Sequence, residues 1–329
     1  SFFIEVIKSP TYLSAVSPLA HPPSNNAKIS VNTRHKCFFF IADWHSLTTH
    51  PHPGDVTANV RKILSEYLAC GIDPEKAAIY VQSDVKEVLE LYLYLNMNAY
   101  LGELQRVTSF KEKARKQPEN VNAGLLTYPT LMAADILIHR ADKVPVGKDQ
   151  EQNMEMARKF ARRFNTIYGV EFFPEPQSYS FGGDAIKVPG LDGSGKMGKS
   201  EGNAIYLIDD AATIRKKVMK AVTDSGPTQP NSEKPEAIAN LFTMLKIVSS
   251  ADTYDYFNEK YNACEIRYGD LKKQLAEDIV NFTSPIRERI LAYAADTEYM
   301  DKVAREGAEK ARASADKTIR EVRKIIGFN

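Results

Sequence analysis

The sequence predicts an α/β fold, with a doubly wound parallel sheet early in the chain and an all-helical domain after it. Two observations predict this fold. Short apolar runs alternate with helical patterns in the first third of the chain, an order typical of parallel sheets. Beyond residues 208–210 the spacing of apolar residues is almost wholly helical. The length of 329 residues is enough for two domains with buried cores.

The first predicted strand covers residues 37–42, a short apolar and aromatic run typical of a strand covered on both faces. It ends next to His45, at the carboxyl edge where open α/β sheets bind ligands. Apolar residues at helical spacing follow over 56–68, and Gly71 ends that helix. The next strand is predicted over 77–81.

A further helix follows the second strand. Asp84, with Glu87 three residues later, matches a capping box at its start. Residues 91–100 are apolar nearly all round, which indicates burial against a domain or a second subunit. Later helices are predicted over roughly 214–222, 236–248, 251–262, 266–280, 284–295 and 300–326.

Composition excludes several classes of protein. The net charge of +1 means that any nucleic-acid surface is local. The three cysteines are far apart and lack metal spacing, so we expect reduced thiols in a cytoplasm. No apolar run reaches membrane-spanning length, and the opening residues lack the features of a signal peptide. His50 and His52 stand beside prolines without cysteine or acidic neighbours, so we expect no metal site.

The helix predicted over residues 129–140 carries an acid among apolar neighbours. Tyr128, Met132 and Asp135 are spaced four and three apart and so share one face. A buried, unpaired carboxylate costs several kcal/mol, so Asp135 needs a donor from the fold or from a ligand. From burial alone, a structural acid that holds backbone or an arginine is the commoner case.

Two glycine-containing segments follow the acid. A strand-like run over 143–146 ends at Gly147, and Gln150 opens a helix that continues to about residue 167; this is an arrangement that can hold a phosphate. Residues 196–200 lie among glycines and place two lysine ammonium groups three residues apart on a loop. Each feature alone has an ordinary structural explanation, but together they favour a nucleotide site.

These motifs resemble a known family. The segments 102–106, 110–113, 127–137, 144–150 and 196–200 are similar to those of bacterial-type tryptophanyl-tRNA synthetases, class I enzymes. The resemblance extends from about residue 37 to the C-terminus. It implies a Rossmann-like catalytic domain over 1–205, a helical anticodon-binding domain over 206–300, and a last helix, about 300–329, that packs back on the first domain. It also implies a homodimer that pairs through the region around 91–100.

The resemblance implies an activity and a set of site residues. Tryptophan would attack the α-phosphorus of ATP, and the acyl group would then pass to tRNA(Trp), with Mg²⁺ carried on the phosphates. The implied catalytic groups are Lys196, Lys199 and Lys111. The implied ATP-binding residues are Gly147, Lys148, Asp149, Ile186, Lys196, Met197, Gly198, Lys199 and Ser200. The implied tryptophan-binding residues are Asp135, which accepts the indole N–H, Met132, Tyr128, Gln150 and His45.

The chain departs from the family in two places. Gly198 stands where the family usually has serine, which leaves both ammonium groups in place. Residues 1–36 lack the expected glycine-containing His-x-Gly-His or His-x-Gly-Asn signature, and no glycine precedes Gly54. We interpret this difference as a local frame error in the gene model. The alternative explanation is a paralogue that has lost catalysis but still binds tryptophan or nucleotide. A tyrosine-specific relative is a separate alternative for the function, and Met132 disfavours it.

Overall fold

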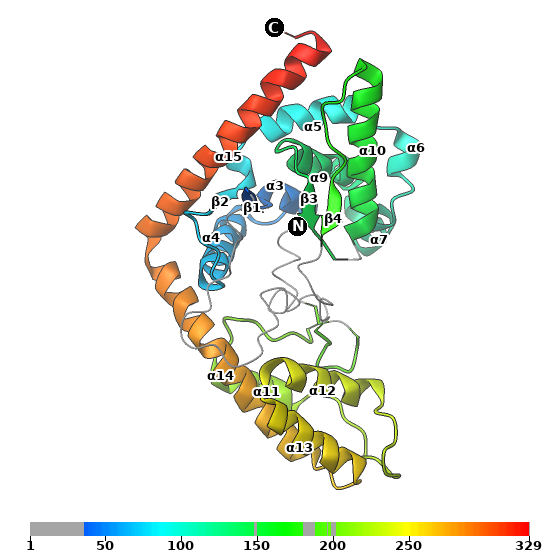
Figure 1. The fold of residues 1–329 in the computed structure, drawn as a ribbon, viewed down its shortest axis with the longest axis vertical. Coiled ribbons are helices and arrows are strands. Elements are labelled where there is room, and N and C mark those ends of the chain that lie inside the picture. Colours follow the sequence, from blue (N-terminus) through cyan, green and yellow to red (C-terminus); the bar gives the residue numbers. More distant parts are fainter. Residues whose placement is uncertain (1–35, 148–149, 180–187, 196, 199–201, 329) are drawn as a thin grey trace.

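The computed structural model describes residues 36–147, 150–179, 188–195, 197–198 and 202–328 (Figure 1). The discrepancy within residues 1–35 lies outside these ranges. The predictions for six site residues also lie outside them: Lys148, Asp149, Ile186, Lys196, Lys199 and Ser200.

Parallel strands form the sheet from which the candidate site is built. β1 (Cys37–Ile41) and β2 (Ala77–Val81) pair in parallel, and α4 (Pro53–Ala69) connects them. Both strands lie where the sequence predicts them. The α/β class with parallel strands is therefore confirmed.

A second parallel pair follows further along the chain. β3 (Lys143–Pro145) pairs with β4 (Gln177–Tyr179), and α10 (Glu151–Tyr168) crosses between them. In both pairs the connection contains a helix, as parallel strands require.

Helices make up most of the remaining described chain. Around the strands lie α3 (Asp43–Ser46), α5 (Glu87–Met97), α6 (Leu101–Leu104), α7 (Thr108–Lys116), α8 (Ala123–Leu126), α9 (Tyr128–Leu137) and the 3₁₀ turns Leu47–Thr49, Gln82–Asp84 and Pro118–Asn120. Further along lie α11 (Ala211–Met219), α12 (Glu236–Val248), α13 (Ala251–Asn262), α14 (Tyr268–Ala295) and α15 (Thr297–Ile326). No helix in the described ranges is both long enough and apolar enough to span a bilayer.

Buried apolar side chains form two clusters. One lies around β1, β2, α9 and α10 and includes residues of α15. The other lies within α11–α14 and includes Met197, next to the predicted nucleotide loop. α14 and α15 run along one side of the molecule, so that α14 extends from the second cluster and α15 packs along the first (Figure 1).

Two sequence predictions about helix ends are wrong. The predicted break between residues 280 and 284 is absent, because α14 continues through Pro285. A proline removes one hydrogen bond, and the packing of α14 on α4, α11 and α12 holds the helix together despite that loss. The capping box is also absent: Asp84 ends a 3₁₀ turn, and α5 begins at Glu87 without a side-chain cap.

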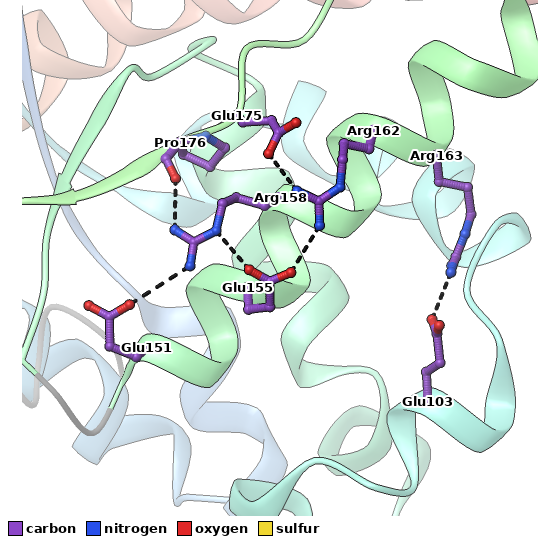
Figure 2. Close-up of polar contacts among 8 residues, drawn as sticks. All are labelled: Glu103, Glu151, Glu155, Arg158, Arg162, Arg163, Glu175 and Pro176. Atoms are coloured by element: carbon purple, nitrogen blue, oxygen red, sulfur yellow. Dashed lines mark hydrogen bonds and ion pairs between the residues drawn. The ribbon is translucent and has the colours of Figure 1, made fainter.

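A network of arginines and glutamates joins α10 to the segment before β4 (Figure 2). Arg158 donates to Glu155 at 2.9 Å and to the carbonyl of Pro176 at 3.1 Å, and it lies 3.8 Å from Glu151. Arg162 bridges Glu155 and Glu175. This network ties the segment before β4 to α10.

The contact between α15 and β2 depends on a glycine. A Cβ atom on Gly307 would lie 1.8 Å from the carbonyl oxygen of Ile79, so the helix can approach the strand only without a side chain there. The same approach would place that Cβ 2.6 Å from the Ile79 carbonyl carbon and 2.8 Å from its nitrogen. Backbone atoms cannot rotate away as a side chain would.

We therefore expect Gly307→Ala to lower the free energy of unfolding by about 3 kcal/mol, the upper end of the usual cost of overpacking. Urea unfolding followed by circular dichroism measures the change. Gly269→Ala on α14 is the matched control, because nothing lies within 4 Å of its added Cβ. Equal stability of the two variants would contradict the proposed close packing of α15 on β2.

Candidate functional site

Asp135 on α9 is buried, as the sequence predicts, with 5% of its surface exposed. Its Oδ2 lies 2.8 Å from Nε2 of His45, and its Oδ1 accepts a hydrogen bond from Nε2 of Gln82 at 2.7 Å. Among the described residues, no lysine or arginine pairs with this acid. Asp135 is therefore held by a histidine and an amide instead of the structural arginine that was the main alternative.

Burial controls the protonation of this cluster. Burial raises the pKa of Asp135 to about 8, and the hydrogen bond from Gln82 offsets part of that rise. Burial also lowers the pKa of His45 well below its usual value, and the charge of Lys113 lowers it further. His45 is therefore neutral at pH 7, and its Nε2–H donates whenever Asp135 is ionised. The ionised acid would gain from any additional donor.

The carboxyl ends of β1 and β2 bring the two partners of Asp135 together. His45 lies on α3, directly after β1, and Gln82 is the first residue after β2. Asp43 joins these two ends, because its Oδ1 accepts from the backbone N–H of Trp44 and of Ser83, both at 3.0 Å. The site is thus at the sheet edge where the sequence places it.

The cluster has more acceptors than donors. Within the described chain, Nδ1 of His45 and Oε1 of Gln82 are buried and have no hydrogen-bond partner. With His45 donating from Nε2, its Nδ1 is an acceptor, as is the Gln82 oxygen. A carboxylate also has about four lone-pair directions, and the described residues occupy two of those of Asp135. The arrangement therefore suits a ligand that brings an N–H group.

Tyr128 and Met132 share the face of α9 that carries Asp135, as predicted. The ring of Tyr128 packs edge-on against His45, with centroids 4.5 Å apart. Met132 is 1% exposed and lies in the first core. Gln150 lies at the start of α10, where its Oε1 accepts from Nδ2 of Asn153 at 2.9 Å.

A cavity of about 140 Å³ lies beside the face of α9 that carries Tyr128. Tyr128 belongs to its wall, and Asp135 does not. The wall consists of Trp44, Leu47, Thr48, Tyr92, Asn122, Gly124, Thr127, Tyr128 and Leu131.

The structure draws attention to a lysine that the sequence analysis missed. The ammonium group of Lys113 lies 3.7 Å from the centroid of the Tyr128 ring, whereas the predicted Lys111 is exposed. Both lysines are on α7, and residues two apart on a helix point in different directions. The signal that could have selected Lys113 is therefore helical phase, which charge alone does not show.

The predicted nucleotide loop is anchored where the structure describes it. Met197 is 2% exposed, packs in the second core, and donates from its backbone to Val188 O at 3.1 Å. The N–H of Gly198 donates to Oδ1 of Asn203 at 2.9 Å, and Asn203 donates to Asp192. Asn203, which sequence reasoning also missed, thus holds the backbone beside the predicted lysines.

Other predicted features have ordinary places in the fold. Gly147 is exposed at the turn before α10, and its carbonyl accepts from the N–H of Gln150 at 3.0 Å. His52 caps α4, accepting from the N–H of Gly54 at 3.2 Å. No group of three potential metal ligands occurs among the described residues.

Comparisons with known proteins all identify tRNA synthetases as similar to this chain. The family model described as "tRNA synthetases class I (W and Y)" matches residues 25–284. A tryptophan–tRNA ligase of Porphyromonas gingivalis is 77% identical over 91% of this chain and 92% of its own length. A tryptophan–tRNA ligase of Listeria monocytogenes is 40% identical over 89% of this chain and 88% of its own.

A solved structure is similar to this chain over nearly the same share of its length. The tryptophanyl-tRNA synthetase of Campylobacter jejuni, determined with ADP and tryptophan, superposes with a TM-score of 0.79 at 33% identity. The match covers 90% of this chain and 91% of that one.

Proposed function

The chain belongs to the class I tRNA synthetases for tryptophan and tyrosine, and from this premise we propose that it ligates L-tryptophan to tRNA(Trp) at the expense of ATP. The observation that carries the choice of amino acid is the buried Asp135, held by the uncharged His45 and Gln82. An acid of this kind accepts the indole N–H, and Met132 beside it offers nothing to a phenol hydroxyl. A site with such a buried acceptor rejects analogues that lack the N–H.

The reaction proceeds in two steps. The tryptophan carboxylate attacks the α-phosphorus of ATP and pyrophosphate leaves; the acyl group then passes from the adenylate to the 3′ end of the tRNA. The substrate carboxylate is already a nucleophile, so the protein needs no general base. Its contribution is to align the two substrates and to stabilise negative charge on the phosphates.

We assign these tasks to named residues. Tyr128 and Gln150 hold the α-amino group of tryptophan, and Gly147, Lys148, Asp149 and the backbone of Ile186 frame the nucleotide. Lys196 and Lys199, in a loop with Met197, Gly198 and Ser200, stabilise the triphosphate as point charges. Mg²⁺ bound to the phosphate oxygens would neutralise part of their charge.

A cation from α7 completes the phosphate site. Lys113 approaches Tyr128 and so supports this role for α7 better than Lys111 does. We keep Lys111 as a second cation at the rim.

Tryptophan-dependent exchange of pyrophosphate into ATP, followed by charging of tRNA(Trp), tests the proposed activity. We expect exchange with tryptophan and none with phenylalanine. Binding of tryptophan without exchange would instead indicate a paralogue that has lost catalysis. Exchange that depends on tyrosine would indicate the tyrosine-specific alternative.

Peptide mass spectrometry of the first 40 residues would show whether the protein contains the given residues there or has a frame error in its gene model.

Tryptophan affinity is expected to depend on pH through Asp135. The pKa of this acid is about 8 in the empty site, and an N–H donor favours the ionised form and so lowers it. Affinity is therefore fully present above pH 8 and falls as the pH drops through 8, by at most about tenfold per pH unit. The pKa of His45 lies well below the pH range over which Asp135 titrates, and the pKa of Tyr80 lies well above it.

Calorimetric titration between pH 6.5 and 8.5 measures this dependence. Asp135→Asn is the control, because an amide does not titrate and its affinity should be flat over the same range. A wild-type affinity that is flat over the range would contradict the proposed contact.

The assembly follows from an exposed apolar stripe on α5. Leu89, Leu93 and Met97 are spaced four apart and are 43%, 50% and 75% exposed, while Leu91 and Leu95 are buried. Water-exposed apolar stripes of this kind mark protein contacts. We propose that two copies pair through this stripe, as the family resemblance implies, and a monomer in analytical ultracentrifugation would contradict it.

We also propose a division into two domains and a cellular location for the protein. We propose a catalytic domain over 1–205, joined by the C-terminal helix, and a helical domain over 206–300 that binds the anticodon. The two hydrophobic clusters support a division into two domains, and the second cluster also takes in Val188, Leu191, Met197 and Ala204. Measuring the binding of tRNA(Trp) by variants that lack a basic side chain of α11 tests whether the helical domain binds tRNA. A cytoplasmic location follows from the use of tRNA, and fractionation of cells tests it.

A further inference from the structure

Gln82 is a buried amide that neither the family motifs nor the sequence analysis singles out. It is 1% exposed and directly follows β2. Its Nε2 donates to Oδ1 of Asp135 at 2.7 Å, across a separation of 53 residues in the chain. Its Oε1 has no hydrogen-bond partner within the described part of the chain. A buried amide that leaves one atom unpaired carries a cost that a purely structural residue would avoid.

The contact fixes the plane of the carboxylate. The terminal torsion of an aspartate is soft, so one hydrogen bond would leave the carboxylate free to rotate about the bond to its Cβ. His45 contacts Oδ2 and Gln82 contacts Oδ1, so both oxygens are held. Two held oxygens define one orientation of the plane, and the remaining lone pairs then point in fixed directions.

Gln82 is itself held in place. The backbone N–H of Val85 donates to its carbonyl at 3.0 Å, which closes the 3₁₀ turn. The N–H of the next residue, Ser83, donates to Asp43 at the end of β1. The turn that carries Gln82 is thus fixed to both strands.

An uncharged donor orients the acid without neutralising it. A lysine or arginine at this position would form an ion pair and compete with a ligand for the negative charge. The amide of Gln82 satisfies one oxygen and brings no opposing charge, so the ionised form of Asp135 keeps its charge for a ligand.

We propose that Gln82 is a positioning residue for tryptophan selection, which aims the carboxylate of Asp135 at the indole N–H. This inference rests on the proposed function of the site. It assigns Gln82 an effect on the N–H group of the substrate and none on the rest of the ring.

The test uses an analogue of tryptophan, β-(3-benzothienyl)alanine, in which sulfur replaces the indole N–H while the ring keeps its shape. Calorimetry on the full chain gives the affinity ratio between tryptophan and this analogue, and does not depend on catalytic activity. Gln82→Met keeps the length of the side chain and removes the donor. We expect it to reduce the ratio about tenfold or more, the usual weight of a hydrogen bond to a charged group.

Two further variants sharpen the test. Gln82→Asn keeps an amide but is one methylene shorter and falls short of Oδ1, so it should reduce the ratio in the same way. Gln117→Met is the matched control, because Gln117 donates to the carbonyls of Thr48 and Asn120 beside the site and not to Asp135. It should change both affinities equally and leave the ratio as in the wild type.

The outcomes separate the inference from the proposed function. If the wild type binds the analogue as tightly as tryptophan, the role assigned to Asp135 is wrong and the inference falls with it. If the wild type prefers tryptophan and either Gln82 variant keeps the same ratio, Gln82 does not position the acid. A ratio that falls in both Gln82 variants and not in the control supports the proposal.

Discussion

Replacing Asp135 with alanine is expected to reduce kcat/KM for tryptophan in pyrophosphate exchange about 10³-fold or more, while the KM for ATP changes little. The variant removes the buried acceptor for the indole N–H and leaves the donors on His45 and Gln82 without a partner. Discrimination between tryptophan and phenylalanine should fall by a similar factor, because the penalty for an unpaired acid disappears with the acid.

Thr130→Val is the matched control for this variant. Thr130 lies on the same helix, is fully buried, and has no hydrogen-bond partner for its hydroxyl within the described residues. Its replacement by an apolar side chain of the same shape should leave amino-acid selection unchanged. Unchanged discrimination in Asp135→Ala would rule out the assignment of the acid.

The second large effect is expected at the two loop lysines. Lys196→Ala and Lys199→Ala should each slow adenylate formation about 10²- to 10³-fold, because each removes a positive charge that stabilises the transition state. Rapid-quench measurement of adenylate formation separates this step from tRNA binding. The affinity for tryptophan alone should stay within a factor of two or so, since the lysines act on phosphate.

Lys317→Ala, an exposed lysine on α15, provides the control and should leave the rate unchanged. If the loop variants altered only the affinity for tRNA, the lysines would belong to the tRNA surface and not to the phosphate site.

Local pattern was enough to predict the elements that carry the site. The strands at 37–42 and 77–81 and the face shared by Tyr128, Met132 and Asp135 follow from periodicity, and the structure confirms them. Burial of Asp135 followed from its neighbours on the helix. These features depend on residues that lie within one turn or one strand of each other.

Tertiary partners could not be predicted in this way. Asp135 contacts His45 across 90 residues and Gln82 across 53, and no local pattern signals that Gln82 faces the acid. One prediction of helix ends was wrong for a related reason, namely that tertiary packing decided the outcome. The sequence predicts a break between residues 280 and 284, yet the packing of α14 against its neighbours keeps the helix continuous through Pro285. The sequence predicts Lys111 as the cation of α7, and only the structure shows that Lys113 lies against the ring of Tyr128.

A crystal structure of the full chain with tryptophan bound would show which group binds the indole N–H. We predict that the indole nitrogen lies about 3 Å from a carboxylate oxygen of Asp135 and that the contacts from His45 and Gln82 are retained. An indole nitrogen bonded to another group, or a ring bound in the neighbouring cavity away from Asp135, would contradict it.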